Sequence, residues 1–112
     1  MLNDARKDLN RALENSPKDE QVLFLRGLLN FALHRFFDAL CDFERVIEKV
    51  DDTNAVHYLA RGRCYACLSM FKEAITDLSI AINLNKDLLD AYLNRGKCAY
   101  LIGDTGLAFV DF

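Results

Sequence analysis

The sequence has little proline, no long apolar run and no block of like charges, and each absence excludes a class of protein. One proline in 112 residues, with 52% hydrophobic and 28% charged residues, excludes a disordered or fibrous chain and indicates one soluble domain of modest core. No apolar stretch approaches the roughly 20 residues of a membrane-spanning helix, and the opening MLNDARKDLN is too polar for a secretory signal. Membrane insertion is therefore not expected. Because the net charge is −3 and no run of like charges occurs, nucleic acid is not an expected partner either.

Three residue types recur at a spacing of 34 or 35 residues. The recurring glycines are Gly27, Gly62 and Gly96, each preceded by an arginine, at Arg26, Arg61 and Arg95. The recurring alanines include Ala39, Ala74 and Ala108, each followed four residues later by a large apolar side chain. Apolar positions within the unit recur with helical spacing, so each repeat is predicted to carry two amphipathic helices. The recurrence indicates one structural unit written several times.

The repeated glycine falls in the middle of the first predicted helix of each unit. A glycine there costs about 1 kcal/mol relative to alanine, so its recurrence requires a compensating contact. We expect close approach of the neighbouring helix at the small Ala39, Ala74 and Ala108 to supply it.

The repeat resembles the tetratricopeptide repeat. The stretch YLARGRCYACLSMFKEAITDLSIAINL matches the family pattern at Tyr58, Gly62, Tyr65, Phe71, Ala74, Leu78 and Ala81. The stretch YLNRGKCAYLIGDTGLAFVDF matches it at Gly96, Gly103, Ala108 and Phe112. The first full unit departs from the pattern, with Leu23 for the aromatic residue, His34 for a turn glycine and Val46 for an alanine.

The resemblance implies an all-α, right-handed solenoid of antiparallel helix pairs with about seven helices. The expected organisation is a single array segment, with the second helix of a partial repeat at 1–19, full repeats at 20–54 and 55–88, and a repeat at 89–112 that ends within its second helix. Solenoid repeats bury their faces only against neighbouring repeats. The apolar end at 104–112 is therefore expected to pack on a second chain or to fray.

A row of aspartates runs in phase with the arginines. The row consists of Asp8, Asp42, Asp77 and Asp111 on the second helices, so that Arg26, Arg61 and Arg95 each have one aspartate 16 residues downstream and one 18 or 19 upstream. We predict a structural row of bidentate ion pairs between adjacent helices. The alternative is two solvated rows of charge, and the sequence leaves open which aspartate each arginine takes.

The four cysteines offer little chemistry. Cys64 and Cys67 form one Cys-x-x-Cys pair, whereas a structural zinc site needs a second such pair or a histidine pair, and His34 and His57 lie elsewhere in the repeat. Core packing of reduced thiols is the prediction, which favours a cytoplasmic or nuclear protein. No metal, cofactor or catalytic constellation is expected, so the chain is interpreted as a non-enzyme.

The resemblance also implies a binding groove lined by the first helix of each repeat, which would hold a peptide or helix of a partner protein. The groove positions are Gln21, Phe24, Leu25, Leu28 and Phe31, then Val56, Leu59, Ala60, Arg63 and Cys67, then Asp90, Leu93, Asn94, Lys97 and Tyr100. A ligand with large apolar side chains near Phe24 and Phe31, and a polar or acidic group toward Arg63 and Lys97, would suit them. The alternative is that Phe24 and Phe31 are core residues or cover the chain's own neighbouring helix.

One specialised groove of the family is not expected in this segment. Family members that clamp acidic chaperone tails use lysine, asparagine and arginine at positions that hold Phe24, Leu28, Ala60, Asp90 and Asn94 here. Two functions remain: a groove that captures a partner segment, or an architectural segment of a longer array that packs on itself or on identical chains.

Overall fold

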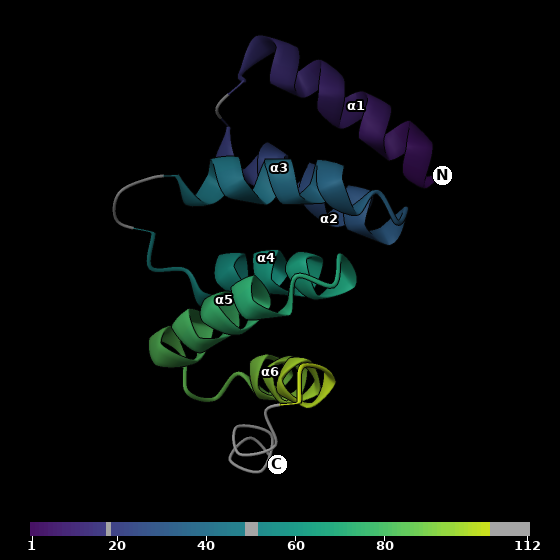
Figure 1. Cartoon of the computed structure of the whole chain (residues 1–112). Coiled ribbons are helices and arrows are strands. Elements are labelled where there is room, and N and C mark those ends of the chain that lie inside the picture. The colour runs from purple at the N-terminus through teal and green to yellow at the C-terminus, as the bar shows by residue number, and fades with distance from the viewer. Residues whose placement is uncertain (18, 49–51, 104–112) are drawn as a thin grey trace. The chain divides into compact units, whose positions relative to one another are not determined.

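The structure, a computed structural model, describes residues 1–17, 19–48 and 52–103, and every regular element in them is an α-helix (Figure 1). The six helices are α1 (Leu2–Asn15), α2 (Glu20–Ala32), α3 (Phe36–Ile47), α4 (Ala55–Cys67), α5 (Phe71–Leu84) and α6 (Leu89–Leu101). The seventh helix of the predicted set, like the expected self-association surface at 104–112, lies outside the described residues. None of the described helices has the length and apolar character needed to cross a bilayer.

The helices belong to two compact units, Met1–Asp52 and Thr53–Phe112. In the first unit, α2 contacts both α1 and α3, and a short link at 33–35 makes α2 and α3 antiparallel neighbours (Figure 1). Asp19 caps the N-terminus of α2, because its side chain accepts a hydrogen bond from the backbone amide of Val22 at 3.2 Å. Leu13, Leu23 and Val46, one from each helix, form a core cluster that fixes the three helices together.

In the second unit, formed by α4, α5 and α6, each helix contacts the other two. Asn54 caps the N-terminus of α4, because its side chain accepts a hydrogen bond from the backbone amide of Val56 at 3.0 Å. The core is larger here and draws on all three helices, with buried members Ala55, Leu59, Ala74, Leu78, Ala81, Ile82, Ala91 and Cys98. Tyr58, Tyr65 and Tyr92 pack against its edge.

The turn after each first helix places one residue in the left-handed region. His34 has φ 61°, Ser69 has φ 60° and Gly103 has φ 84°. These positions are 35 and 34 residues apart, so the turn belongs to the repeat. Only the third turn uses glycine, which adopts this conformation without steric penalty.

The repeated glycines make room mainly for the large apolar residue of the facing helix. A Cβ atom built on Gly27 would lie 2.5 Å from Cε1 of Phe43, and one on Gly62 would lie 3.0 Å from Cδ2 of Leu78. The predicted approach at the alanine is present at Gly62, where the backbone oxygen of Ala74 would lie 3.4 Å from the same Cβ. Ala39 and Ala74 are fully buried. Ala108 lies outside the described residues.

Candidate functional site

Two of the repeated arginines form bidentate ion pairs with buried aspartates. Arg61 Nε lies 2.7 Å from Asp77 Oδ2 and its Nη2 lies 2.8 Å from Oδ1. Arg26 Nε lies 3.0 Å from Asp42 Oδ2, and its Nη2 also donates to the same carboxylate. The Arg26 pair joins α2 to α3 and the Arg61 pair joins α4 to α5. Each arginine on the first helix of a repeat therefore pairs with the downstream aspartate, on the second helix of the same repeat. The hydrogen bond to Asp42 raises the pKa of Arg26 above its ordinary value.

On the preceding helix, two of the repeated arginines donate hydrogen bonds to residues other than the predicted upstream aspartate. Arg26 Nη1 donates to Asn10 Oδ1 at 2.9 Å, while Asp8 is exposed on α1. Arg95 Nη1 donates to Ser79 Oγ at 3.2 Å. Asn10 and Ser79 occupy equivalent repeat positions, two residues after the aspartate position, and a polar residue there could have been sought in the sequence. The downstream aspartate of Arg95, at position 111, lies outside the described residues.

The two ion pairs have different surroundings. The guanidinium carbon of Arg61 lies 5.9 Å from the ring centroids of both Tyr58 and Tyr65, within cation–π range. Arg95 lies 5.8 Å from the ring of Tyr92. The equivalents of the two tyrosines beside Arg26 are Leu23 and Asn30. Asn30 Nδ2 instead donates to Asp42 Oδ2 at 3.1 Å, so this carboxylate accepts from two side chains.

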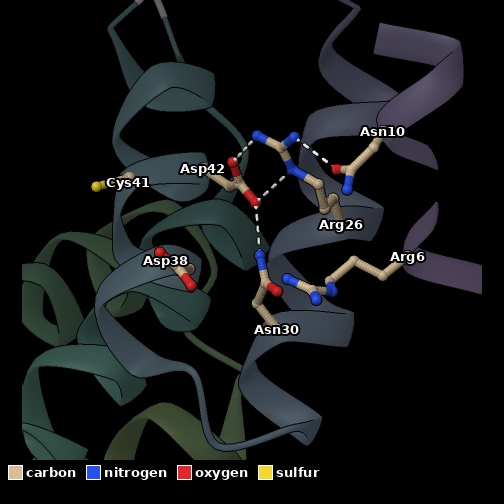
Figure 2. Close-up of a pocket in the computed structure, with 7 residues that line it drawn as sticks. All are labelled: Arg6, Asn10, Arg26, Asn30, Asp38, Cys41 and Asp42. Carbon is tan, nitrogen blue, oxygen red and sulfur yellow. Dashed lines mark hydrogen bonds and ion pairs between the residues drawn. The ribbon is translucent and has the colours of Figure 1, made fainter. Parts of the chain in front are cut away.

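A pocket of about 280 Å³ opens beside the first ion pair, between α1, α2 and α3 (Figure 2). Its lining consists of Arg6, Asn10, Arg26, Asn30, Asp38, Cys41 and Asp42. Sequence reasoning assigned no role to Arg6 or Asn30. The repeat alignment held the signal, because Arg6 stands where Leu40 and Ile75 stand, and Asn30 stands where Tyr65 stands.

The cysteines divide into two classes. Cys64 and Cys98 are buried, whereas Cys41 and Cys67 are exposed, and all four are free thiols. Burial raises the pKa of the Cys64 thiol to about 12, with a smaller upward contribution from Cys67. Burial likewise raises the pKa of Cys98. No group of three or more histidine, cysteine, aspartate or glutamate side chains in the described part of the chain could hold a metal ion.

The predicted groove residues of the first unit lie on α2. Gln21 and Leu28 are exposed, and Phe24 and Phe31 are half-buried. The Phe24 ring lies 5.5 Å from that of Phe43, and the Phe31 ring lies 5.2 Å from that of Phe36. Both phenylalanines therefore pack against α3 of their own unit, as the alternative interpretation has it.

The predicted groove residues of the second unit lie on α4 and α6. The exposed ones are Val56, Arg63, Cys67, Asp90, Leu93, Lys97 and Tyr100, and Asn94 is half-buried. Leu59 and Ala60 are buried, and Leu59 belongs to the hydrophobic core. A partner could not reach Leu59 without unpacking that core. Gly96, in the middle of α6, is buried as well.

Comparison with known proteins finds relatives of the predicted kind, although no protein-family profile matches the chain. Tetratricopeptide repeat protein 16 of Mus musculus is 31% identical over 120 residues, which cover 96% of this chain and 16% of that protein. Its Homo sapiens counterpart is 28% identical over 123 residues, 99% of this chain and 14% of that protein. Hsc70-interacting protein 1 of Drosophila melanogaster is 28% identical over 101 residues, 90% of this chain and 26% of that protein. The chain thus spans a small part of these relatives.

Solved structures share the fold. The crystal structure of MamA has a TM-score of 0.93 at 23% identity and covers 98% of this chain and 64% of its own. The first tetratricopeptide domain of Spaghetti (RPAP3), bound to the HSP90 peptide SRMEEVD, has a TM-score of 0.77 at 25% identity, over 82% of this chain and 72% of its own. These similarities confirm the predicted all-α, solenoid-type fold.

Proposed function

Because the chain belongs to the tetratricopeptide repeat family, we propose that it is a non-catalytic interaction module that binds a segment of a partner protein. The proposed binding surface is the exposed apolar face of the first helices, α2 in the first unit and α4 with α6 in the second. Two similar proteins support the interaction role through what is said of them: one is an Hsc70-interacting protein and one was solved with an HSP90 peptide.

The exposure of large apolar side chains carries the proposal. Five of the groove positions on the first helices hold such residues, with exposed fractions from 41% to 70%: Leu25, Leu28, Val56, Leu93 and Tyr100. On the second helices α3 and α5 only Phe37 and Leu84 are comparably exposed. Leu25 and Leu28 are three residues apart on α2, and Leu93 and Tyr100 are seven apart on α6, so each pair lies on one face of its helix. Exposed apolar surface of this kind marks interaction sites in soluble proteins.

The charges on the same helices indicate what the ligand carries besides its apolar anchors. Arg63 and Lys97 are exposed on α4 and α6, and Asp90 is exposed near the start of α6. We propose a ligand segment with one or two large apolar side chains and a polar or acidic group. The acidic-tail clamp stays outside this proposal, because Phe24, Leu28 and Ala60 supply no cation or amide at its positions.

The test is selection of peptides from a displayed library of human or mouse protein segments, followed by affinity measurement by fluorescence anisotropy. Leu28→Asp should weaken a peptide selected on the first unit at least about tenfold, since a buried apolar anchor contributes about 1.5–3 kcal/mol. Phe37→Asp is the matched control, because it places the same charge on the exposed face of α3. Leu93→Asp and Leu84→Asp form the corresponding pair in the second unit.

The outcomes separate the two functions. If the α2 and α6 variants lose the peptides and the α3 and α5 controls keep them, the first helices are the binding surface. If the controls lose them equally, the proposal is wrong. The alternative, an architectural segment that packs on copies of itself, predicts that Leu28→Asp lowers the apparent mass in sedimentation equilibrium and that the selection returns no saturable peptide.

A further inference from the structure

The pocket between α1, α2 and α3 is lined by two polar residues at positions that are apolar or aromatic elsewhere in the repeat. Arg6 of α1 stands where Leu40 and Ile75 stand, and Asn30 of α2 stands where Tyr65 and Ala99 stand. About 280 Å³ stays open beside these two side chains. A water molecule takes about 30 Å³ in the liquid, so the pocket has room for a whole side chain.

Two buried polar atoms in this pocket have no hydrogen-bond partner within the described part of the chain. They are Oδ1 of Asn30 and Nε of Arg6. Asn30 is only 3% exposed. Its orientation is fixed, because Asp42 can only accept and therefore requires the NH2 group of Asn30, which turns the oxygen away from Asp42 and toward Arg6 (Figure 2). A buried acceptor without a partner is unfavourable, so a ligand that donates to it gains affinity.

The charges around these atoms select the ligand. Asp42 is neutralised by Arg26 through two hydrogen bonds, which leaves Arg6 and Asp38 as opposite charges on the lining. An anion would face the Asn30 oxygen and Asp38, and a cation would face Arg6. A neutral group that carries a donor beside an acceptor can donate to the Asn30 oxygen and accept from Arg6 Nε.

We propose that this pocket binds a carboxamide, the side chain of a glutamine or asparagine of a partner protein. The proposal rests on the proposed function only in that the partner is a protein, since the lining shares no residue with the exposed apolar positions Leu25 and Leu28 of α2. The carboxamide NH2 donates to Oδ1 of Asn30, and its oxygen accepts from Nε of Arg6.

The probes are propionamide, propionate and propylammonium, which have similar size and differ in the head group. Each is titrated into the 15N-labelled 112-residue chain, and the resonances of the Asn30 side-chain NH2 and the Arg6 Nε–H are followed by NMR. Propionamide should give saturable shifts of both groups in the millimolar range expected for so few atoms, at least about tenfold tighter than the other two probes. Equal saturation by all three probes, or linear shifts with each, would overturn the proposal.

Matched variants locate the binding. Asn30→Tyr restores the residue of the second unit and should abolish the saturable shift at Arg6, whereas Asn83→Tyr makes the same exchange on the exposed surface of α5 and should leave it unchanged. Arg6→Leu, which copies Leu40, is the second variant should Asn30→Tyr unfold. Persistence of propionamide binding in a folded variant of either kind would contradict the assignment. Leu28→Asp should retain it, so the two proposals fail separately.

Discussion

The arginine of the first unit and that of the second make the same ion pair in different surroundings. Arg61 pairs with Asp77 and is flanked by the rings of Tyr58 and Tyr65. Arg26 pairs with Asp42, but its other neighbours are amides, Asn10 at one guanidinium nitrogen and Asn30 at the shared carboxylate.

The comparison shows which parts of the repeat are fixed by packing and which are free to vary. The glycine, the large apolar residue it admits and the ion pair recur because they hold a first helix against a second one. The positions around the guanidinium have no such role in backbone geometry. They hold aromatic rings in the second unit and line a polar pocket in the first, so the two units differ at these positions.

The largest expected effect comes from removing either buried carboxylate. Asp77→Ala should lower the free energy of unfolding by about 3–5 kcal/mol, because it leaves a partly buried guanidinium without its partner. Asp42→Ala should lower it by at least as much, since Asn30 also loses its acceptor. Urea denaturation followed by circular dichroism measures both. Asp38→Ala, an exposed carboxylate 3.8 Å from Arg35, is the control and should change stability by less than about 0.5 kcal/mol. If Asp77→Ala lowers the free energy of unfolding by less than about 1 kcal/mol, the ion pairs contribute little to stability.

The thiols provide the next contrast. Iodoacetamide at pH 8 should modify Cys41 and Cys67 at least about 100-fold faster than Cys64, because the thiolate is the reactive form and burial suppresses it. Mass spectrometry of peptides from timed samples gives the rates. Between the ordinary pKa of 9.0 and the raised pKa of about 12, the Cys64 thiol keeps its proton in the folded state and loses it in the unfolded state. Because the unfolded state then binds fewer protons, the free energy of unfolding should fall as the pH rises across this range. Equal rates for Cys64 and Cys67 in the native protein would contradict the burial of Cys64.

The two glycines should respond unequally to alanine. Gly27→Ala places a Cβ against a ring that cannot yield easily, and should lower stability by about 1–2 kcal/mol after the gain in helix propensity is counted. Gly62→Ala places its Cβ 3.0 Å from Cγ and Cδ2 of Leu78 and 3.4 Å from the backbone oxygen of Ala74. These contacts are looser than those at Gly27, so the gain in helix propensity should leave the variant nearly neutral. Thermal unfolding of the two variants tests the difference. If Gly27→Ala becomes as stable as the parent on adding Phe43→Leu, the ring is the cause, and the reverse order of effects would refute this explanation.

The smallest effect is expected at the turns. His34→Gly and Ser69→Gly should each raise stability by about 0.5–1 kcal/mol, because they remove the cost of a left-handed backbone from a residue with a Cβ. Gly103→Ala should lower it by a similar amount. Differential scanning calorimetry resolves shifts of this size. A fall in stability for both glycine variants would mean that the side chains of His34 and Ser69 contribute more than the strain they impose.

Much of the fold follows from the repeat read in the sequence. The all-α class and the tetratricopeptide relationship are confirmed, since phase-locked glycine, alanine and apolar positions report directly on helix packing. The close helix approach at the glycine is predicted from the spacing, but spacing along the chain does not show which side chain fills the gap. Phe43 and Leu78 fill it.

The site was harder to predict. Surface and core positions on one helix differ by a single residue step, so Leu59 was assigned to the groove although it is buried. Recurring residues do not indicate the pocket, because Arg6 and Asn30 line it at positions where they depart from the repeat. Two unpartnered buried atoms become visible only once three helices are placed together. The repeat boundaries and the groove assignment remain predictions.

The most direct test of the proposed interaction role is hydrogen–deuterium exchange of the chain with and without a peptide obtained from the selection. Slowed exchange is expected on α2 for a ligand of the first unit, or on α4 and α6 for a ligand of the second, with α3 and α5 unchanged. Protection confined to α3 or α5 would contradict this expectation, because the ligand would then sit on the second helices and the exposed apolar side chains of the first helices would need another explanation.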